Sequence, residues 1–352
     1  MKREYGIDLL KMIAMIMVVT HHILNTGVET KVLESLGGGA LCTFIMQMFH
    51  VFCYCAVDVF VMATGYIMCR LGFKYVRIVR LWRQVVGYSL VLCLIGYFAG
   101  LKIGWRDWSN SIMPITTNQY WFFTQYFALF FMIPFLNRLI DSLTERETWG
   151  LLATGLGLLS LMPIIAGRDL FVTKWGYCCL WFMYLYCIGA AIRKLDIVNQ
   201  VKARYAILGL LLGCGISACG AVAGEFLPGL IGGGGRLGDF AYSYTSPSLV
   251  LEALALFVLL AKLHFREECV FSRFIVFCAP STFIVYVVHS NGVFRRIIEW
   301  DAIFLPLSDY GILVAVIGSL LCAVAIFCMI VLVDSLRRIG WKYIERQFNG
   351  SN

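Results

Sequence analysis

The first apolar stretch of the chain carries four side chains that can move a proton or hold a charge. The segment "IDLLKMIAMIMVVTHH", residues 7–22, contains Asp8, Lys11, His21 and His22. On a helix, Lys11 and His22 are about three turns and roughly 16 Å apart on one face, and His21 points about 100° away from His22. Asp8 lies one turn before Lys11 and can pair with it. We therefore predict His22 as the histidine that faces a cavity; the alternative is that Lys11 snorkels and both histidines lie at the outer interface.

A row of cations follows the second apolar stretch. Arg70, Lys74, Arg77, Arg80 and Arg83 lie within fourteen residues. The last four recur every three residues, so a helix would present them along one face. Guanidinium groups bind phosphate through paired hydrogen bonds. The alternative interpretation is that these cations bind the headgroups of anionic lipids. Five cations exceed what orientation in the membrane requires, which favours a phosphate-bearing ligand.

Two later segments offer weaker candidates. The segment "TFIVYVVHSN" places His289 inside an apolar stretch, where a histidine is more often packed than catalytic; His50 and His264 are weaker candidates still. The aromatic segment "NQYWFFTQYFALFFMIPFLN", residues 118–137, is typical of an interfacial belt. We predict a helix there that is kinked or ends near Pro134.

Helices in a membrane must position these side chains. The chain has 352 residues, of which 60% are hydrophobic and 14% charged, with a mean hydropathy of +0.80. A soluble domain could not cover so much apolar surface. We predict an all-α, polytopic membrane bundle of about ten transmembrane helices over residues 1–340, followed by a short cytoplasmic tail, 341–352. The predicted spans are 5–25, 43–69, 78–101, 119–139, 149–166, 175–192, 204–224, 247–264, 274–297 and 309–336.

The distribution of cations predicts the orientation. With the N-terminus inside, twenty of the 29 Lys and Arg side chains lie in inner segments and eight in outer ones, while Lys11 lies within a span. This asymmetry places both termini in the cytoplasm. The net charge of +8 then reflects contact with the lipid bilayer, not nucleic acid. The glycines at 232–235 predict a flexible outer gate.

Several of these segments, in this order, resemble the acyltransferase 3 family of integral membrane acyltransferases. That family opens with Asp-Leu, an arginine, ten residues and a histidine, and Asp8, Lys11 and His22 match this spacing. A Ser-Gly-Tyr triplet ends its second span, matched by Thr64 and the two residues after it. The segments "YWFFTQYFALFFMIPFLN", "YTSPS" and "VYVVHSN" also look like parts of that family, and the resemblance spans nearly the whole chain.

The basic run is similar too, although three positions depart from the family pattern. Arginines three residues apart are matched by Arg77 and Arg80, and Arg83 stands where a proline often follows. Lys11 replaces the usual arginine, which keeps the charge but loses the bidentate fork. Thr64 replaces serine and keeps the hydroxyl.

The resemblance implies transfer of an acyl group, usually acetyl, from cytoplasmic acyl-CoA to a hydroxyl of a cell-surface or exopolysaccharide sugar at the plasma membrane. His22 would act as general base or transient acyl carrier, with Lys11 holding a phosphate or the thioester oxygen and Asp8 orienting it. The basic run would bind the coenzyme A phosphates and a second group would form the acceptor site, with acetyl-CoA as substrate and neither bound cofactor nor metal. These two predicted groups are Lys74, Arg77, Arg80 and Arg83 for coenzyme A, and His289, Thr64 and Trp121 for the acceptor.

A transporter is the competing hypothesis. Helices with intramembrane lysine and histidine also suit a proton-coupled small-molecule carrier of the inner membrane. The order of the motifs and the basic row favour the enzyme, and no internal repeat of the kind found in inverted-repeat transporters is visible in the sequence.

Overall fold

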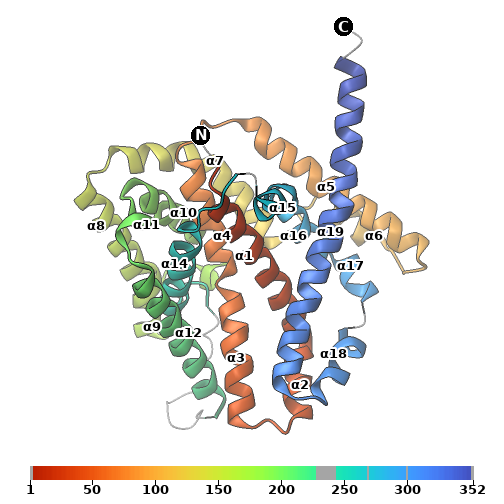
Figure 1. Ribbon diagram of the computed structural model, residues 1–352, viewed down its shortest axis with the longest axis horizontal. Coiled ribbons are helices and arrows are strands. Elements are labelled where there is room, and N and C mark those ends of the chain that lie inside the picture. The colour runs from red at the N-terminus through yellow and green to blue at the C-terminus, as the bar shows by residue number, and fades with distance from the viewer. Residues whose placement is uncertain (1–2, 227–242, 268, 299, 350–352) are drawn as a thin grey trace.

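A computed structural model describes residues 3–226, 243–267, 269–298 and 300–349 of the chain. Within these residues every regular element is a helix, which confirms the all-α prediction (Figure 1). In chain order the elements are α1 (Tyr5–Ile23), η1 (Leu24–Val28), α2 (Glu29–Ser35), α3 (Ala40–Tyr54), α4 (Ala56–Met68), α5 (Tyr75–Phe98), α6 (Trp105–Ile112), α7 (Trp121–Ser142), α8 (Glu145–Leu156), η2 (Gly157–Leu161), α9 (Met162–Ala166), η3 (Lys174–Gly176), α10 (Cys179–Lys194), α11 (Ile197–Gln200), α12 (Ala203–Phe226), α14 (Pro247–Ala261), α15 (Val270–Cys278), η4 (Ala279–Ser281), α16 (Thr282–His289), α17 (Gly292–Ile297), α18 (Trp300–Ser308) and α19 (Ile312–Asn349).

Eight helical stretches in the described part of the chain are long and apolar enough to cross a membrane. The shorter helices α14, with 15 residues, and α10, with 16, occupy two more of the predicted spans. The structure is therefore consistent with about ten spans and with a multi-pass membrane protein. The eight stretches are Tyr5–Ile23, Ala40–Met68, Tyr75–Phe98, Trp121–Ser142, Glu145–Ala166, Ala203–Gly224, Val270–His289 and Ile312–Gly340.

The prediction allowed a kink or an end of the helix near Pro134, and the end is wrong, because α7 continues through this residue to Ser142. A membrane helix tolerates proline when neighbouring groups satisfy the freed carbonyl. The predicted tail begins within α19, which remains helical to Asn349.

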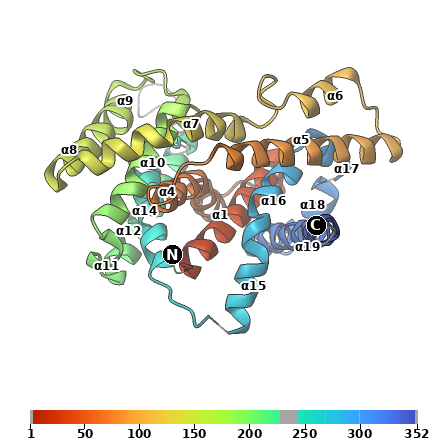
Figure 2. The same cartoon turned by 90° about the horizontal axis from the view of Figure 1, so that it is seen from above.

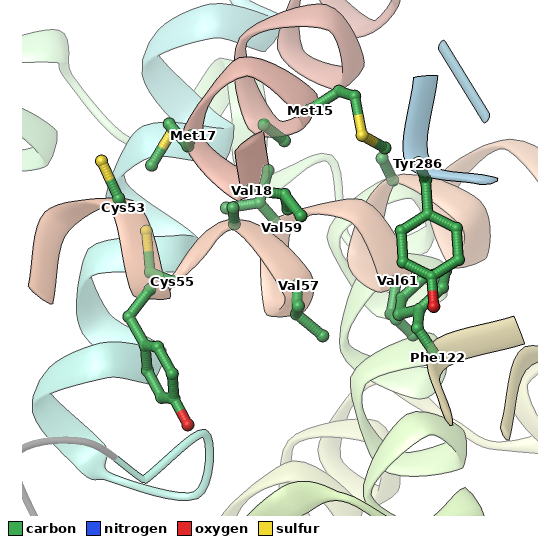
Figure 3. Packing of buried hydrophobic residues seen from close by; sticks show 14 of the residues in the cluster. Met15, Met17, Val18, Cys53, Cys55, Val57, Val59, Val61, Phe122 and Tyr286 are labelled. Atoms are coloured by element: carbon green, nitrogen blue, oxygen red, sulfur yellow. The ribbon is translucent and has the colours of Figure 1, made fainter. Parts of the chain in front are cut away.

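Helix α1 lies in the middle of the bundle, where it packs against α3, α4, α14, α16 and α19 (Figure 1). Its apolar side chains are buried almost all round, as expected for a helix that neighbours surround. Figure 3 shows Val18 of α1 against Val59 of α4, and Phe122 of α7 beside Tyr286 of α16. The core therefore joins segments that are far apart in the sequence.

The helical path of α1 continues to Ser35 through a π-helical turn, Leu24–Val28. A π-turn of this kind inserts one extra residue into an α-helix. Residues beyond it are therefore rotated by about 100° from the positions that regular α-helical spacing predicts. Glu29 is the first residue after this turn.

Helices α4 and α10 cross at two glycines. A Cβ built at Gly65 would lie 2.1 Å from the backbone oxygen of Tyr186, and one at Gly189 would lie 2.0 Å from that of Met62. The two backbones are in direct contact, which only glycine permits. Next to this crossing, Trp181 Nε1 of α10 donates to Asp58 Oδ1 of α4 at 3.2 Å.

A buried carboxylate joins α5 to α19. Asp334 is fully buried and accepts hydrogen bonds from Tyr88 Oη at 2.6 Å, Ser281 Oγ at 2.5 Å and Arg337 Nε at 2.7 Å. In Figure 2, α19 is seen end-on while α5 is seen from the side, so the axes of the two helices are steeply inclined to each other. The carboxylate therefore fixes an oblique α5, whose first turns carry the basic row. These turns, the start of α1 and the C-terminal end of α19 lie at one end of the bundle (Figure 1).

Candidate functional site

A small cavity, with about 20 Å³ of room for water-sized groups, lies beside α1 at the level of the two histidines. Its wall comes from α1, α3, α4, α7 and α16 together with Tyr244. His22 lines it, as predicted, but His21 lines it too, so the expectation that helix geometry separates the two was only half right. The lining residues are Met15, Val18, His21, His22, Cys53, Tyr54, Val57, Phe60, Trp121, Phe122, Tyr244 and Tyr286.

His22 forms a pair with His289, which the sequence placed 267 residues away. His289 Nδ1 lies 2.6 Å from the carbonyl oxygen of Val285; because a carbonyl only accepts, this nitrogen carries the proton. In neutral His289, Nε2 is then an acceptor, and His22 Nδ1 donates to it over 3.0 Å. Neutral His22 is left with a lone pair on Nε2, the form that a base or nucleophile requires. Ser290 Oγ lies 3.5 Å from the same His22 Nδ1.

His21 ends a second chain of polar side chains. Its Nδ1 lies 2.8 Å from Nε2 of His50, and His50 Nδ1 is paired with the Glu29 carboxylate. The other oxygen of Glu29 accepts a hydrogen bond of 2.9 Å from Gln47 Nε2. The sequence interpretation ranked His50 low, because it lies among apolar neighbours, and did not consider Glu29, which lies beyond the first predicted span. His50 lies on α3, 29 residues after His21, so no local spacing signals the contact.

The rings of His21 and His22 lie with centroids 5.7 Å apart. His21 also meets Tyr54 edge-on at 4.9 Å. Among the described residues, no group of three or more His, Cys, Asp and Glu side chains is arranged to hold a metal ion. The four histidines instead form two hydrogen-bonded pairs, His22 with His289 and His21 with His50, whose inner members meet at the cavity.

Aromatic rings form one wall of the cavity. Tyr54 and Tyr244 are stacked with centroids 4.3 Å apart and planes 3° apart. Trp121, at the start of α7, lies 4.5 Å from the Tyr177 ring and 5.7 Å from Tyr244. The hydroxyls of Tyr54 and Tyr177 share a hydrogen bond of 2.9 Å, and Tyr177 is 37% exposed. The wall therefore runs from the histidines toward the surface of the protein, and it includes Trp121, one of the residues predicted for the acceptor site.

Lys11 and Asp8 lie on α1 below this cavity, at the end where the chain starts. Asp8 accepts a hydrogen bond of 2.6 Å from Arg3 Nε. In the described part of the chain no hydrogen bond or ion pair joins Asp8 to Lys11, so the predicted pairing is replaced by one with Arg3.

The basic row begins at the end of α4 and continues on the first turns of α5. Arg77 Nη1 donates to the carbonyl oxygen of Gly72 at 3.0 Å and lies 3.7 Å from Met68 Sδ. Within the described residues, Lys74, Arg80 and Arg83 are exposed and have no hydrogen-bond or ion-pair partner. The three cations are thus available to an anionic ligand.

One predicted acceptor-site residue, Thr64, is not part of the cavity wall. Thr64 is buried and its Oγ1 donates back to the carbonyl oxygen of Phe60 at 3.1 Å, a bond within α4. Phe60, one turn earlier, lines the cavity instead. The glycines at 232–235 lie outside the described residues.

Two buried carboxyl groups were not predicted as part of the site. Asp58 and Glu252 are both fully buried, and each has one oxygen held by a neighbour: Asp58 by Trp181, and Glu252 by Ser217 Oγ at 3.0 Å. Asp58 lies on α4, whose Val57 and Phe60 line the cavity. A single carboxylate in an apolar sequence gives no sign of the partner that a distant helix will supply.

The family comparison covers nearly all of this arrangement. The model of the acyltransferase domain family, acyltransferase 3, matches residues 4–334, which include both histidine pairs, the aromatic wall and the basic row. No curated protein and no solved structure matches the chain. The match favours an enzyme over the transporter alternative. The chain belongs to the acyltransferase 3 family and is a multi-pass membrane acyltransferase.

Proposed function

We propose that this enzyme transfers an acetyl group from cytoplasmic acetyl-CoA to a hydroxyl of a cell-surface or exopolysaccharide sugar, and that it does so in the plasma membrane. The observation that carries the proposal is His22. It stands at the family's histidine position, lines the cavity, and is held by His289 in the tautomer that leaves Nε2 unprotonated. That nitrogen can take the proton of an acceptor hydroxyl or receive the acyl group itself.

The basic row supports coenzyme A as the donor. Arg77 reaches Met68 at the end of α4, and Phe60 lines the cavity eight residues earlier on the same helix. Eight residues of helix span about 12 Å. An extended pantetheine arm is roughly 15–20 Å long. Phosphates bound by Lys74, Arg80 and Arg83 would therefore let the thioester reach the histidines.

The aromatic wall supports a sugar as the acceptor. Sugar rings present apolar C–H faces that pack on aromatic rings, and their hydroxyls need hydrogen-bonding partners. Trp121 and Tyr177 supply a ring surface next to the cavity, while Tyr54 and Tyr177 add hydroxyl groups. Because Tyr177 is partly exposed, an acceptor can approach along this wall from outside. The apolar interior excludes competing water.

Turnover of labelled acetyl-CoA by the purified protein in nanodiscs, with candidate glycans as acceptors, tests the proposal. Wild type should form acetylated glycan, and His22→Ala should lose this activity while it keeps the wild-type unfolding temperature. Full activity in His22→Ala would remove His22 from the reaction. Transport of a solute without acetyl-CoA consumption would overturn the proposal.

Coenzyme A binding provides a separate test of the donor site. We expect Arg80→Ala combined with Arg83→Ala to weaken binding about tenfold or more per arginine, since each charge-assisted hydrogen bond contributes about 1.5–3 kcal/mol. Added salt should weaken wild-type binding more than that of the variant. Arg146→Ala, which removes an exposed cation on α8, is the matched control. Unchanged binding in the double variant would leave the row as an orientation signal only.

A further inference from the structure

The polar chain behind His21 ends at a carboxylate, whereas the chain behind His22 ends at a backbone carbonyl. Glu29, His50 and His21 form a continuous chain from a carboxylate to the cavity. Gln47 fixes the second carboxylate oxygen, so Glu29 is held from two sides. His50 is 5% exposed and His21 is 9% exposed. A chain this well enclosed holds its rings in one orientation.

The carboxylate determines which nitrogen of each ring carries a proton. Glu29 accepts, so His50 Nδ1 is the donor and Nε2 of neutral His50 is an acceptor. His21 Nδ1 must then donate to His50 Nε2, which leaves the lone pair of neutral His21 on its own Nε2. A proton added there can be passed to His50, where Glu29 pairs with the imidazolium. This is the logic of a carboxylate-backed histidine base extended by one ring.

The chain behind His22 is different. It ends at His289 and the carbonyl oxygen of Val285, and neither carries a negative charge. Positive charge is therefore stabilised behind His21 and not behind His22. The cavity holds two neutral histidines, of which one is equipped to keep a proton and the other to act as a neutral nucleophile.

We propose that His21 is a second catalytic residue, the base that deprotonates the acceptor hydroxyl, with Glu29 and His50 as its positioning residues, while His22 carries the acyl group. The proposal rests on the acyl transfer proposed above. In the first half-reaction a C–N bond forms between His22 Nε2 and the acyl carbon as the C–S bond breaks. The thiolate leaves with the electron pair and becomes the thiol by taking up the proton that His22 Nδ1 releases by way of His289, so acyl-His22 and His289 are both left neutral.

In the second half-reaction the acceptor oxygen forms the ester C–O bond as the C–N bond breaks. Its proton passes to His21 Nε2, and His22 Nδ1 regains a proton from water by way of His289. The chain of His21, His50 and Glu29 then releases the extra proton to water, so the sum is thioester plus alcohol giving ester plus thiol. Glu29 lies about 10 Å farther along the helical path than His22, toward the end opposite the basic row. The base chain thus lies on the acceptor's side of the acyl carrier.

The two half-reactions can be measured separately with acetyl-CoA as the only acyl ligand. Exchange of tritiated coenzyme A into acetyl-CoA reports the first, and hydrolysis of acetyl-CoA, with water as the hydroxyl acceptor, reports the second. The variants are His21→Gly and Glu29→Gln of the full chain in nanodiscs. His264→Asn, which changes an exposed histidine, is the matched control.

We expect both variants to keep exchange within about threefold of wild type and to lose hydrolysis by about 10²-fold or more. Retained exchange also shows that each variant is folded. Imidazole added to His21→Gly should restore part of the hydrolysis, which no purely structural role explains. Unchanged hydrolysis, a parallel loss of both rates, or wild-type hydrolysis without exchange would each overturn the assignment. A wild-type protein that neither exchanges nor hydrolyses acetyl-CoA would instead overturn the proposed function.

Discussion

The glycine crossing of α4 and α10 gives a sharp structural prediction for the variant Gly65→Ala. The added Cβ would lie 2.1 Å from the backbone oxygen of Tyr186, whereas ordinary contacts begin at 3.4 Å. The helices must therefore separate by about 1.3 Å, because the obstacle is backbone and cannot rotate away. Overpacking of this kind costs about 1–3 kcal/mol of stability.

The same displacement should impair activity. Phe60 lies on α4 five residues before Gly65 and lines the cavity. The hydrogen bond from Trp181 to Asp58 joins the same two helices. A misplacement of about 1 Å can cost about 10²-fold in rate, so we expect acetyl-CoA turnover to fall by one to two orders of magnitude.

Thermal unfolding and turnover in nanodiscs measure both effects. Gly87→Ala on α5 is the matched control, since a Cβ there meets nothing within 4 Å. The control should keep its activity and gain slight stability from the better helix former. Equal unfolding temperatures and equal rates for Gly65→Ala and wild type would refute the close crossing on which this reasoning depends.

Three further predictions concern single side chains. His289→Leu should lower the rate of acyl transfer by about 10²-fold or more, because His22 loses the acceptor that fixes its tautomer. His289→Gln, whose amide oxygen can still accept, should retain more of this rate, and equal turnover in the two variants would contradict the prediction. The side chain of Ser272 shares a hydrogen bond with Cys269 Sγ and its backbone N–H donates to the same sulfur, and together they lower the pKa of the Cys269 thiol. An impermeant maleimide should therefore label Cys269 at pH 7 faster in the wild type than in Ser272→Ala, and only from the cytoplasmic side; labelling from outside would reverse the topology. Asp334→Leu should lower the free energy of unfolding by on the order of 2 kcal/mol, because three hydrogen bonds are lost but Arg337 is partly exposed. An unchanged unfolding temperature would contradict the role of Asp334 in joining α5 to α19.

The helical class and the approximate spans were predictable because they depend on local composition. An apolar stretch of about twenty residues must be helical in a bilayer, whatever its neighbours. The end of α7 was not predictable, since Pro134 breaks a helix only where its freed carbonyl lacks another partner. Helix α10 begins later than the predicted span because 174–176 form a separate 3-10 turn.

The candidate site was predictable only where spacing within one helix decided it. His22 was identified from its interval to Lys11, and the basic row from its three-residue repeat. The partners come from distant helices: His289 from α16 and His50 from α3. Their contacts depend on packing between helices, and a lone histidine in an apolar stretch carries no sign of what it will meet. His50 was ranked low for this reason.

Glu29 shows how one residue of helical phase decides the chemistry of the cavity. In a regular α-helix, a residue seven positions after His22 lies within about 20° of the face of His22, so Glu29 would lie behind His22. The π-turn Leu24–Val28 inserts one residue and rotates Glu29 by about 100°, which brings it to within about 20° of the face of His21. The carboxylate thereby backs His21 through His50 and leaves His22 without a negative partner. Only one of two adjacent histidines is thus backed by a carboxylate, and in the proposed mechanism that difference assigns the acyl group to His22 and the proton to His21.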